Sequence, residues 1–313
     1  MTSIITNTSA MNALQALRSV NNNLATTQDR ISTGLKVGSA KDNAAYFQIS
    51  ETMKGDSSSY ASINEGLTLT KNSVATARLG SETIQDLAQQ FIDKVAFAQG
   101  ATGGQGEIEN DLNELVKQME TTLSQSTFNG DDMLGAGSYG GADITAGTVA
   151  GATGVLTAST NADATVGVDR NVVTGITRAG GTFATTDIVV KTHDMASLVT
   201  DFKAIATGFA ANAETVATGE AFLAGALASV EGVLTNVTDI ATQLGQSEKS
   251  IEGQQEFLNQ MVDNIDSGVS SMIDADMEEE AARLQALQTQ QQLATQSLAI
   301  ANRGPSSVMS LFQ

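Results

Sequence analysis

The sequence predicts a mainly α-helical protein: a long coiled-coil-like helical hairpin or bundle, with mobile terminal helices and a small β-rich insert. Three observations support this fold class. Apolar residues recur every three or four positions over residues 46–98 and again over 223–272, which is the repeat of a coiled-coil seam. Both ends of the chain continue an apolar repeat with almost no charged side chains. The middle of the chain is instead rich in Gly, Thr, Ala and Val.

Composition narrows the classes of function. Lys and Arg total 16 of 313 residues and the formal net charge is −19, so the chain lacks the basic surface that binds nucleic acid or anionic membranes. Cysteine is absent, which excludes disulfides and thiolate chemistry. We find neither the pattern of a cleaved signal peptide nor that of a transmembrane helix. General secretion rules alone would therefore place the protein in the cytoplasm.

Each of the two seams predicts one long helix. A sustained repeat of 3.5 residues means that both helices supercoil around partners, and at ~1.5 Å per residue each is about 75 Å long. The apolar residues expected on these shell seams are Ile63, Leu67, Ile84 and Phe91 in the first helix and Leu227, Leu234, Leu244, Ile251, Leu258 and Ile265 in the second.

Turn signals divide the region between the long helices. The glycine-rich segment 100–106 ends the first helix, and a shorter antiparallel helix follows it. Residues 126–134 predict a β-hairpin, because Asn129-Gly130 favours the positive φ angles of a type I′ turn. Residues 135–192 predict the small β-rich insert. Residues 195–212 are again helical in pattern, and the sequence leaves their domain open.

The two ends of the chain share a low charge. Residues 1–28 contain one charged side chain, Arg18, and residues 284–313 contain only Arg303. Helices with such thin seams are marginal alone, because ordering costs about 1–2 kcal/mol per residue. We therefore expect both termini to be mobile in the monomer. Uncharged polar side chains can be buried against other copies of the same chain without the cost of desolvating a charged group.

Chemical motifs are few, and none predicts a catalytic, cofactor-binding or metal-binding residue. The G-x-G-x-x-G spacing of residues 135–140 lacks the helix that follows it in a dinucleotide site, so we interpret it as a flexible loop. His193 is the only histidine, and we expect it to be solvated. The carboxylates between Asp274 and Glu280 lack the glycine-turned loop of a calcium site. We interpret them as complementing a helix dipole.

Three segments resemble bacterial flagellin, in the same order along the chain. Residues 29–45, DRISTGLKVGSAKDNAA, are similar to the N-terminal signature of that family. Phe128-Asn-Gly130 is similar to its hairpin, and residues 301–312, ANRGPSSVMSLF, resemble its C-terminal ending. The likeness covers roughly residues 1–134 and 220–313, on either side of the family's variable region.

The resemblance implies a structural subunit that polymerises into the flagellar filament for swimming motility and has no enzymatic activity. Residues 1–33 with 275–313 are expected to form inner filament-core helices. Residues 34–134 with 193–274, including the hairpin, are expected to form the shell, and residues 135–192 the outer variable insert. The assembly residues expected on the inner helices are Leu14, Leu17, Leu24, Ile31, Leu284, Leu287, Leu298, Leu311 and Phe312.

The resemblance also implies partners and a route of export. Copies of the chain itself are the main partner, with hook-associated and filament cap proteins and a flagellar export chaperone; no nucleic acid, membrane or cofactor is expected. The chain would leave the cell unfolded through the flagellar type III apparatus, to lie in the extracellular filament. Alternatives are a hook–filament junction protein, present in few copies, and a secreted coiled-coil adhesin or translocator with helices that are stable in the monomer. An enzyme hosted in the insert is a more distant third.

Overall fold

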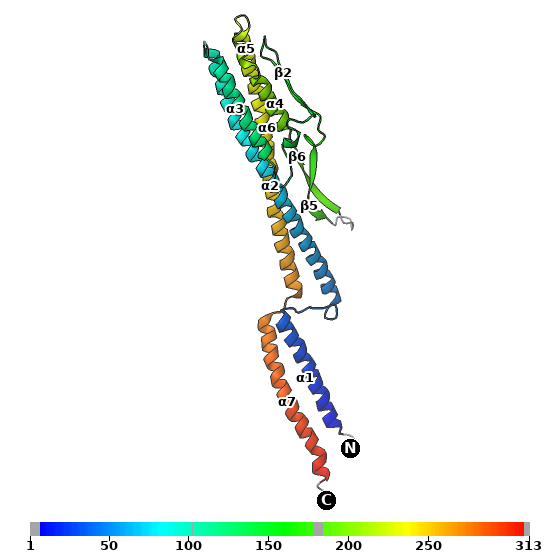
Figure 1. The fold of residues 1–313 in the computed structure, drawn as a ribbon. Coiled ribbons are helices and arrows are strands. Elements are labelled where there is room, and N and C mark those ends of the chain that lie inside the picture. Colours follow the sequence, from blue (N-terminus) through cyan, green and yellow to red (C-terminus); the bar gives the residue numbers. More distant parts are fainter. Residues whose placement is uncertain (1–6, 102, 178–183, 310–313) are drawn as a thin grey trace. The chain divides into compact units, whose positions relative to one another are not determined.

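The computed structural model describes residues 7–101, 103–177 and 184–309 (Figure 1). Its elements, in chain order, are α1 (Thr8–Thr33), α2 (Ala44–Gly100), α3 (Gln105–Gln125), the 3-10 turn η1 (Ala136–Ser138), β1 (Ile144–Thr145), β2 (Thr148–Val149), β3 (Leu156–Thr157), β4 (Thr160–Asn161), β5 (Asp169–Thr177), β6 (Ala184–Lys191), α4 (Met195–Ala206), α5 (Phe209–Ala213), α6 (Gly219–Ile273) and α7 (Met277–Met309). Every strand of the described chain thus lies between Ile144 and Lys191. The prediction of a mainly α-helical protein with a small β-rich insert is confirmed.

The chain divides into two compact units. Unit 1 combines Met1–Ser58 with Met261–Gln313, and unit 2 is Ser59–Gln260. The boundaries fall within α2 and α6, so each of these long helices contributes residues to both units.

Unit 1 is built on the packing of α1 against α7. α1 begins after Asn7, whose Oδ1 accepts a hydrogen bond from the Ala10 amide at 3.0 Å. It ends at Gly34, whose φ of 73° suits glycine. The turn that follows is tied to the end of α6, because the Val37 amide donates to the Ile273 carbonyl at 3.2 Å. Val37, Val269 and Ile273 form a small apolar core at this turn.

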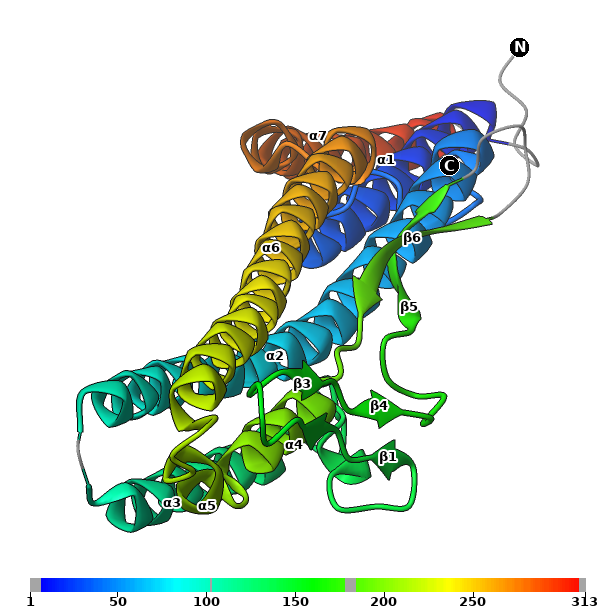
Figure 2. The ribbon, with the colours of Figure 1, turned by 90° about the horizontal axis from the view of Figure 1, so that it is seen from above.

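Unit 2 contains the larger core, which is formed mainly by α2, α3, α4 and α6. Two edge-to-face aromatic pairs join its elements. Phe91 of α2 meets Phe202 of α4 with ring centroids 5.2 Å apart, and Phe209 of α5 meets Phe222 of α6 at 5.6 Å. α4 lies between α3 and the short strands, as Figure 2 shows from above. Residues 195–212, which the sequence left unassigned, therefore belong to this unit.

The predicted helix break is confirmed, and a tight turn closed by one β-bridge lies where the sequence predicts the hairpin. α2 ends at Gly100, and α3 starts after Gly104, which has a φ of 80°. In the hairpin, Asn129 and Gly130 have φ angles of 51° and 80°, and the residues that flank them form a β-bridge. Both positions need a residue that tolerates positive φ, which is why Asn and Gly mark the turn in the sequence.

α6 is the one described helix whose length and composition would allow it to span a membrane. Its apolar residues are used inside the protein, since Leu223, Val230, Val237 and Leu244 are buried in the core of unit 2. Core packing therefore accounts for part of its apolar character, since 33% of its most apolar stretch is buried.

The described part of the insert contains three antiparallel strand pairs, β1 with β4, β2 with β3, and β5 with β6, joined by turns and loops. The β5–β6 pair is fastened to both long helices. The Tyr60 hydroxyl of α2 donates to the Ile176 carbonyl at 3.0 Å, and the Gln254 side-chain amide of α6 donates to the Thr174 carbonyl at 3.1 Å.

Glycines let another part of the insert lie directly on α6. A Cβ at Gly225 would stand 1.8 Å from the Thr153 carbonyl oxygen, and a Cβ at Gly154 would stand 1.9 Å from the Phe222 carbonyl oxygen. No side chain fits at either position, so loop backbone packs on helix backbone.

Gly225→Ala is expected to lift this loop off α6. Overpacking at a close contact typically costs about 1–3 kcal/mol, and hydrogen exchange over residues 150–156 should accelerate. Gly232→Ala is the matched control, because it lies on the same helix with nothing within 4 Å of its Cβ position. It should leave exchange in the loop unchanged. Equal protection in the two variants would contradict the close packing.

His193 corrects an expectation from the sequence. It is only 7% exposed rather than solvated. Its amide donates to the Met133 carbonyl at 2.8 Å, and the next residue, Asp194, caps α4 by accepting from the Ser197 amide at 3.1 Å. These contacts place the segment in the interior of unit 2. The sequence around His193 gives no indication of them, because Met133 is distant in the chain.

The burial of His193 predicts a pH dependence of stability. Burial first, and then the charge of Lys191, lower the pKa of His193 below its usual 6.5. Its contribution to stability is therefore complete above pH 6.5 and is lost as the pH falls through the folded pKa. In denaturant unfolding at a series of pH values, the wild-type chain should lose more stability on acidification than His193→Gln does. Parallel pH profiles would refute this.

Candidate assembly surface

α1 and α7 pack through one residue every three or four positions. The least exposed residues on this repeat are Ala10, Ala13, Leu17, Val20, Leu24, Thr27 and Ile31 on α1, and Glu280, Leu284, Leu287, Gln291, Ala294, Leu298 and Ala301 on α7. Within the described part of the two helices, just Thr27, Glu280 and Leu287 are fully buried. Because many of the seam residues are small or polar, the contact is thin.

Uncharged hydrogen bonds supplement the seam. The Asn7 side-chain amide donates to the Ala301 carbonyl at 2.9 Å, and the Gln291 side-chain amide donates to Asn21 Oδ1 at 2.8 Å. Such bonds hold the helices in register without burying ions.

The assembly residues predicted from sequence are placed as follows. Leu17, Leu24, Ile31, Leu284 and Leu298 are half-buried on the seam, and Leu287 is buried. Leu14 lies outside the repeat and is 38% exposed, whereas Leu311 and Phe312 lie outside the described residues.

The predicted shell seams lie in the apolar cores. In unit 2, the fully buried members are Leu67, Ile84, Phe91, Leu244, Ile251 and Leu258, and the half-buried members packed against them are Ile63, Leu227 and Leu234. Ile265 is half-buried against the small core of unit 1.

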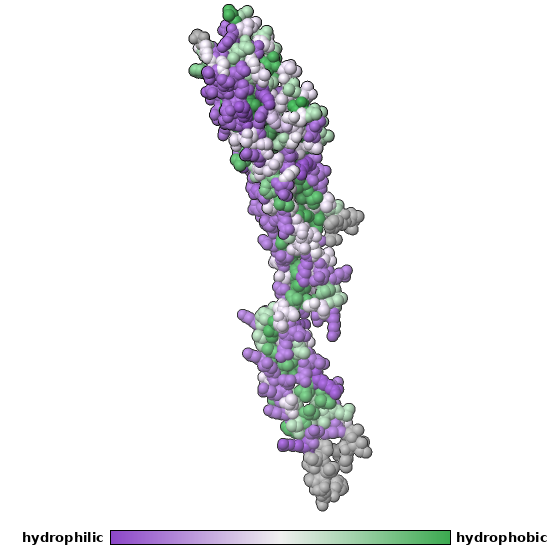
Figure 3. Space-filling model, in the orientation of Figure 1, coloured by the Kyte–Doolittle hydropathy of each residue, from purple (hydrophilic) through white to green (hydrophobic). Residues whose placement is uncertain are grey.

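A second apolar stripe lies on α7, away from the seam. Leu293 and Ile300 are seven residues apart, which places them on one face of the helix, and they are 59% and 72% exposed. On α1, Met11 is also exposed. Figure 3 shows hydrophobic residues reaching the surface of these helices among hydrophilic ones. Leu293 and Ile300 thus expose apolar groups on the part of α7 that carries a single charge, Arg303, between residues 284 and 309.

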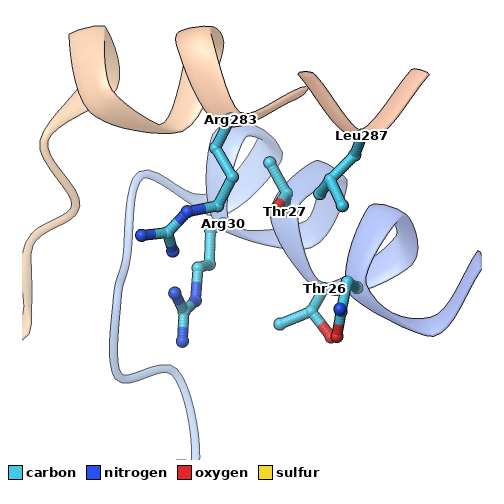
Figure 4. Close-up of a pocket in the computed structure, with 6 residues that line it drawn as sticks. Thr26, Thr27, Arg30, Arg283 and Leu287 are labelled. Atoms are coloured by element: carbon cyan, nitrogen blue, oxygen red, sulfur yellow. The ribbon is translucent and has the colours of Figure 1, made fainter. Parts of the chain in front are cut away.

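A charged cluster interrupts the uncharged seam where α1 ends and α7 begins. Arg30 Nη1 and Arg283 Nη1 both lie near Glu280 Oε1, at 3.1 and 3.2 Å, and Arg283 Nη2 pairs with Glu279 at 2.7 Å. The other oxygen of Glu280, Oε2, is buried and accepts no hydrogen bond from a described residue. Glu280 thus depends on the two arginines, which Figure 4 shows side by side.

Sequence reasoning missed this cluster, although one signal was present. Glu280 occupies a position of the α7 repeat, four residues before Leu284. A carboxylate on an otherwise apolar seam needs a cationic partner, but nothing local identifies Arg30, which is 250 residues away.

The acidic segment before α7 behaves as the sequence predicted. Asp276 Oδ1 accepts hydrogen bonds from the amides of Glu278 and Glu279 at 3.0 and 3.2 Å, and the first turn of α7 is acidic. These carboxylates therefore complement the helix dipole. Among the described residues, no group of three or more His, Asp or Glu side chains could hold a metal ion.

Both ends of the chain match family models of known proteins. The family model described as the bacterial flagellin N-terminal helical region matches residues 4–138, and the bacterial flagellin C-terminal helical region matches residues 227–312. A flagellin of Brucella melitensis biotype 1 is 35% identical over an alignment of 315 positions, and flagellin C of Rhizobium meliloti is 35% identical over one of 355 positions. Flagellin A of Rhizobium meliloti is 32% identical over 395. All three alignments span 100% of both chains.

Proposed function

The chain belongs to the bacterial flagellin family, and from that membership we propose that it is a structural subunit of the flagellar filament, polymerising through α1 and α7 to serve swimming motility. The observation that carries this proposal is the surface of α7. Leu293 and Ile300 stand exposed on a helix whose residues from 284 onward include one charge, Arg303.

Burial of these side chains against other copies supports assembly energetically. Removing a large aliphatic side chain from water contributes about 1.5–3 kcal/mol, and a nearly uncharged surface avoids the cost of desolvating ions. In such a filament, a surface of one copy meets a different surface of the next copy. Heterologous contacts of this kind need not close into a ring, and when they do not close they generate an open helix.

The roles of the three regions follow from the same premise. Residues 1–33 with 275–313 line the interior of the filament, residues 34–134 with 193–274 form the shell around it, and residues 135–192 project outward. The thin α1–α7 seam supports a monomer in which the termini order only on docking, although their mobility stays a prediction.

Export and further partners belong to this proposal as well. The chain is exported unfolded through the flagellar type III apparatus with the help of a chaperone, and it meets hook-associated and cap proteins at the ends of the filament. Family membership supports this route, and flagellins are a structural family, which supports the absence of catalysis. The junction protein and the coiled-coil adhesin are not favoured, because the relatives that match over the full chain are flagellins.

Electron microscopy tests the proposal. Purified chain under precipitating conditions should form uniform filaments, and a chain truncated after Asp274, which lacks α7, should form none. Filaments from the truncated chain would show that other surfaces drive assembly. Persistent monomer from the intact chain would overturn self-polymerisation and favour the junction protein.

A further inference from the structure

The packing of α2 against α6 is thin over residues 59–71 and 251–260 of unit 2. The fully buried apolar residues in these two stretches are Leu67, Ile251 and Leu258. α3 lies against a later part of α2, since Ser126, which follows α3, lies at Gly80. Apolar burial is the main stabilising contribution to a seam between helices, so the pairing of α2 with α6 is weak in this stretch.

Polar contacts join the same two stretches. The Gln255 side-chain amide donates to Thr68 Oγ1 at 2.8 Å, and Lys71 Nζ pairs with Glu252 Oε1 at 2.7 Å. Gln255 lies four residues after Ile251, at a position of the apolar repeat, and a polar residue in a helix seam lowers its stability. The lysine and glutamate side chains are 31% and 51% exposed, and exposed ion pairs contribute little.

The β5–β6 pair lies alongside this stretch in both views of the ribbon (Figure 1 and Figure 2) and bonds to both helices. The Tyr60 hydroxyl of α2 donates to the Ile176 carbonyl at 3.0 Å, and the Gln254 side-chain amide of α6 donates to the Thr174 carbonyl at 3.1 Å. Thr174 lies at a register shift in the pairing of β5 with β6. A residue at such a bulge is left out of the strand pairing, so its carbonyl is available to α6.

The β5–β6 pair also has one face toward the core. Val172 and Ile188 lie opposite each other in the pair, and both pack, partly buried, against the core of unit 2. The next residue along each strand, Val173 or Val189, is 43% or 58% exposed. A hairpin of two strands is marginally stable alone in water. The strand pair and the thin helix seam therefore each need a partner, and they lie against each other.

We infer that the β5–β6 pair is a clasp that holds α2 and α6 together over residues 59–71 and 251–260. Because the pair is bonded to both helices at once, the helices separate only if one of the two contacts breaks. The free energy of docking the pair therefore adds to that of pairing the helices, as coupling between two contacts is reciprocal. Residues 169–191 of the insert then stabilise the proposed shell from within the single chain, whether or not copies polymerise.

Two conservative variants, each measured on the opposite helix, test the clasp. Tyr60→Phe removes the hydroxyl from α2, and Gln254→Met removes the amide from α6. In hydrogen exchange of the full-length monomer, Tyr60→Phe should accelerate exchange over residues 250–260 about fivefold, because one hydrogen bond is lost. Gln254→Met should have the same effect over residues 59–71. Exchange in β5 and β6 should accelerate in both variants.

Tyr46→Phe and Gln260→Met are the matched controls. They make the same replacements on the same two helices at exposed positions, and they should leave exchange in both stretches unchanged. α4 should also exchange as in the unaltered chain, because its contact with Phe91 is untouched. Unchanged exchange on the opposite helix, even with faster exchange in β5 and β6, would overturn the inference. Equal acceleration in the controls or in α4 would overturn it too, since it would show a general loss of stability.

Discussion

Replacing Leu293 and Ile300 together by Gln is expected to prevent filament formation at concentrations where the unaltered chain polymerises. The two side chains are 59% and 72% exposed in the single chain, and we place them between copies in the filament. Burying each contributes about 1.5 kcal/mol or more, so losing both raises the critical concentration roughly a hundredfold. Gln is a good helix former, and α7 itself should remain intact.

A conservative pair of substitutions controls this experiment. Leu293→Met with Ile300→Met keeps both positions apolar and of similar volume, so the chain should polymerise at nearly the normal critical concentration. Sedimentation of both double variants over a concentration series measures the difference. If the Gln variant polymerises as readily as the Met variant, this stripe is not an interface.

Arg30→Met is expected to loosen α1 from α7 within the single chain. The Glu280 side chain is 6% exposed, and its Oε2 has no described partner. Removing one partner from a buried ion pair costs about 3–5 kcal/mol. Because the Arg30 side chain is 25% exposed and Arg283 remains, we expect a loss of about 2 kcal/mol. Hydrogen exchange should accelerate at the end of α1 and the start of α7, where the two helices meet at this ion pair.

A double substitution distinguishes two effects of Arg30→Met: the loss of the Arg30 side chain itself, and the burial of Glu280 without its partner. Arg30→Met with Glu280→Met leaves no buried charge and should recover most of the protection. Lys54→Met serves as a control in the same unit, because the Lys54–Glu51 pair is about half exposed on both sides and contributes little. Equal exchange in the single and double variants would show that Glu280 is not held as described.

Periodic features of the fold could be predicted from sequence because they depend on local spacing. Leu67 and Leu244 recur on 3.5-residue repeats, and both are fully buried. The Asn129-Gly130 turn was predictable because few residues adopt its positive φ angles. The pairing of the short strands β1 to β4 was not, since each is only two residues long and so shows no alternating pattern in the sequence.

Only the apolar residues of the candidate assembly surface could be predicted from the sequence; its charged cluster could not. Leu17, Leu24 and Leu298 follow the repeat, but Arg30 and Glu280 meet only when α1 and α7 pack. His193 was placed wrongly for a related reason: its burial results from the Met133 carbonyl and the start of α4. A single polar residue carries no periodic signal.

In the proposed filament, α1 and α7 are buried between copies of the chain. A helical reconstruction of the polymer by electron cryomicroscopy tests it most directly. The expected result is that Leu293 and Ile300 are covered by neighbouring subunits, with α1 and α7 in the interior of the filament. A polymer in which these side chains stay exposed, and copies touch through residues 135–192 alone, would contradict it.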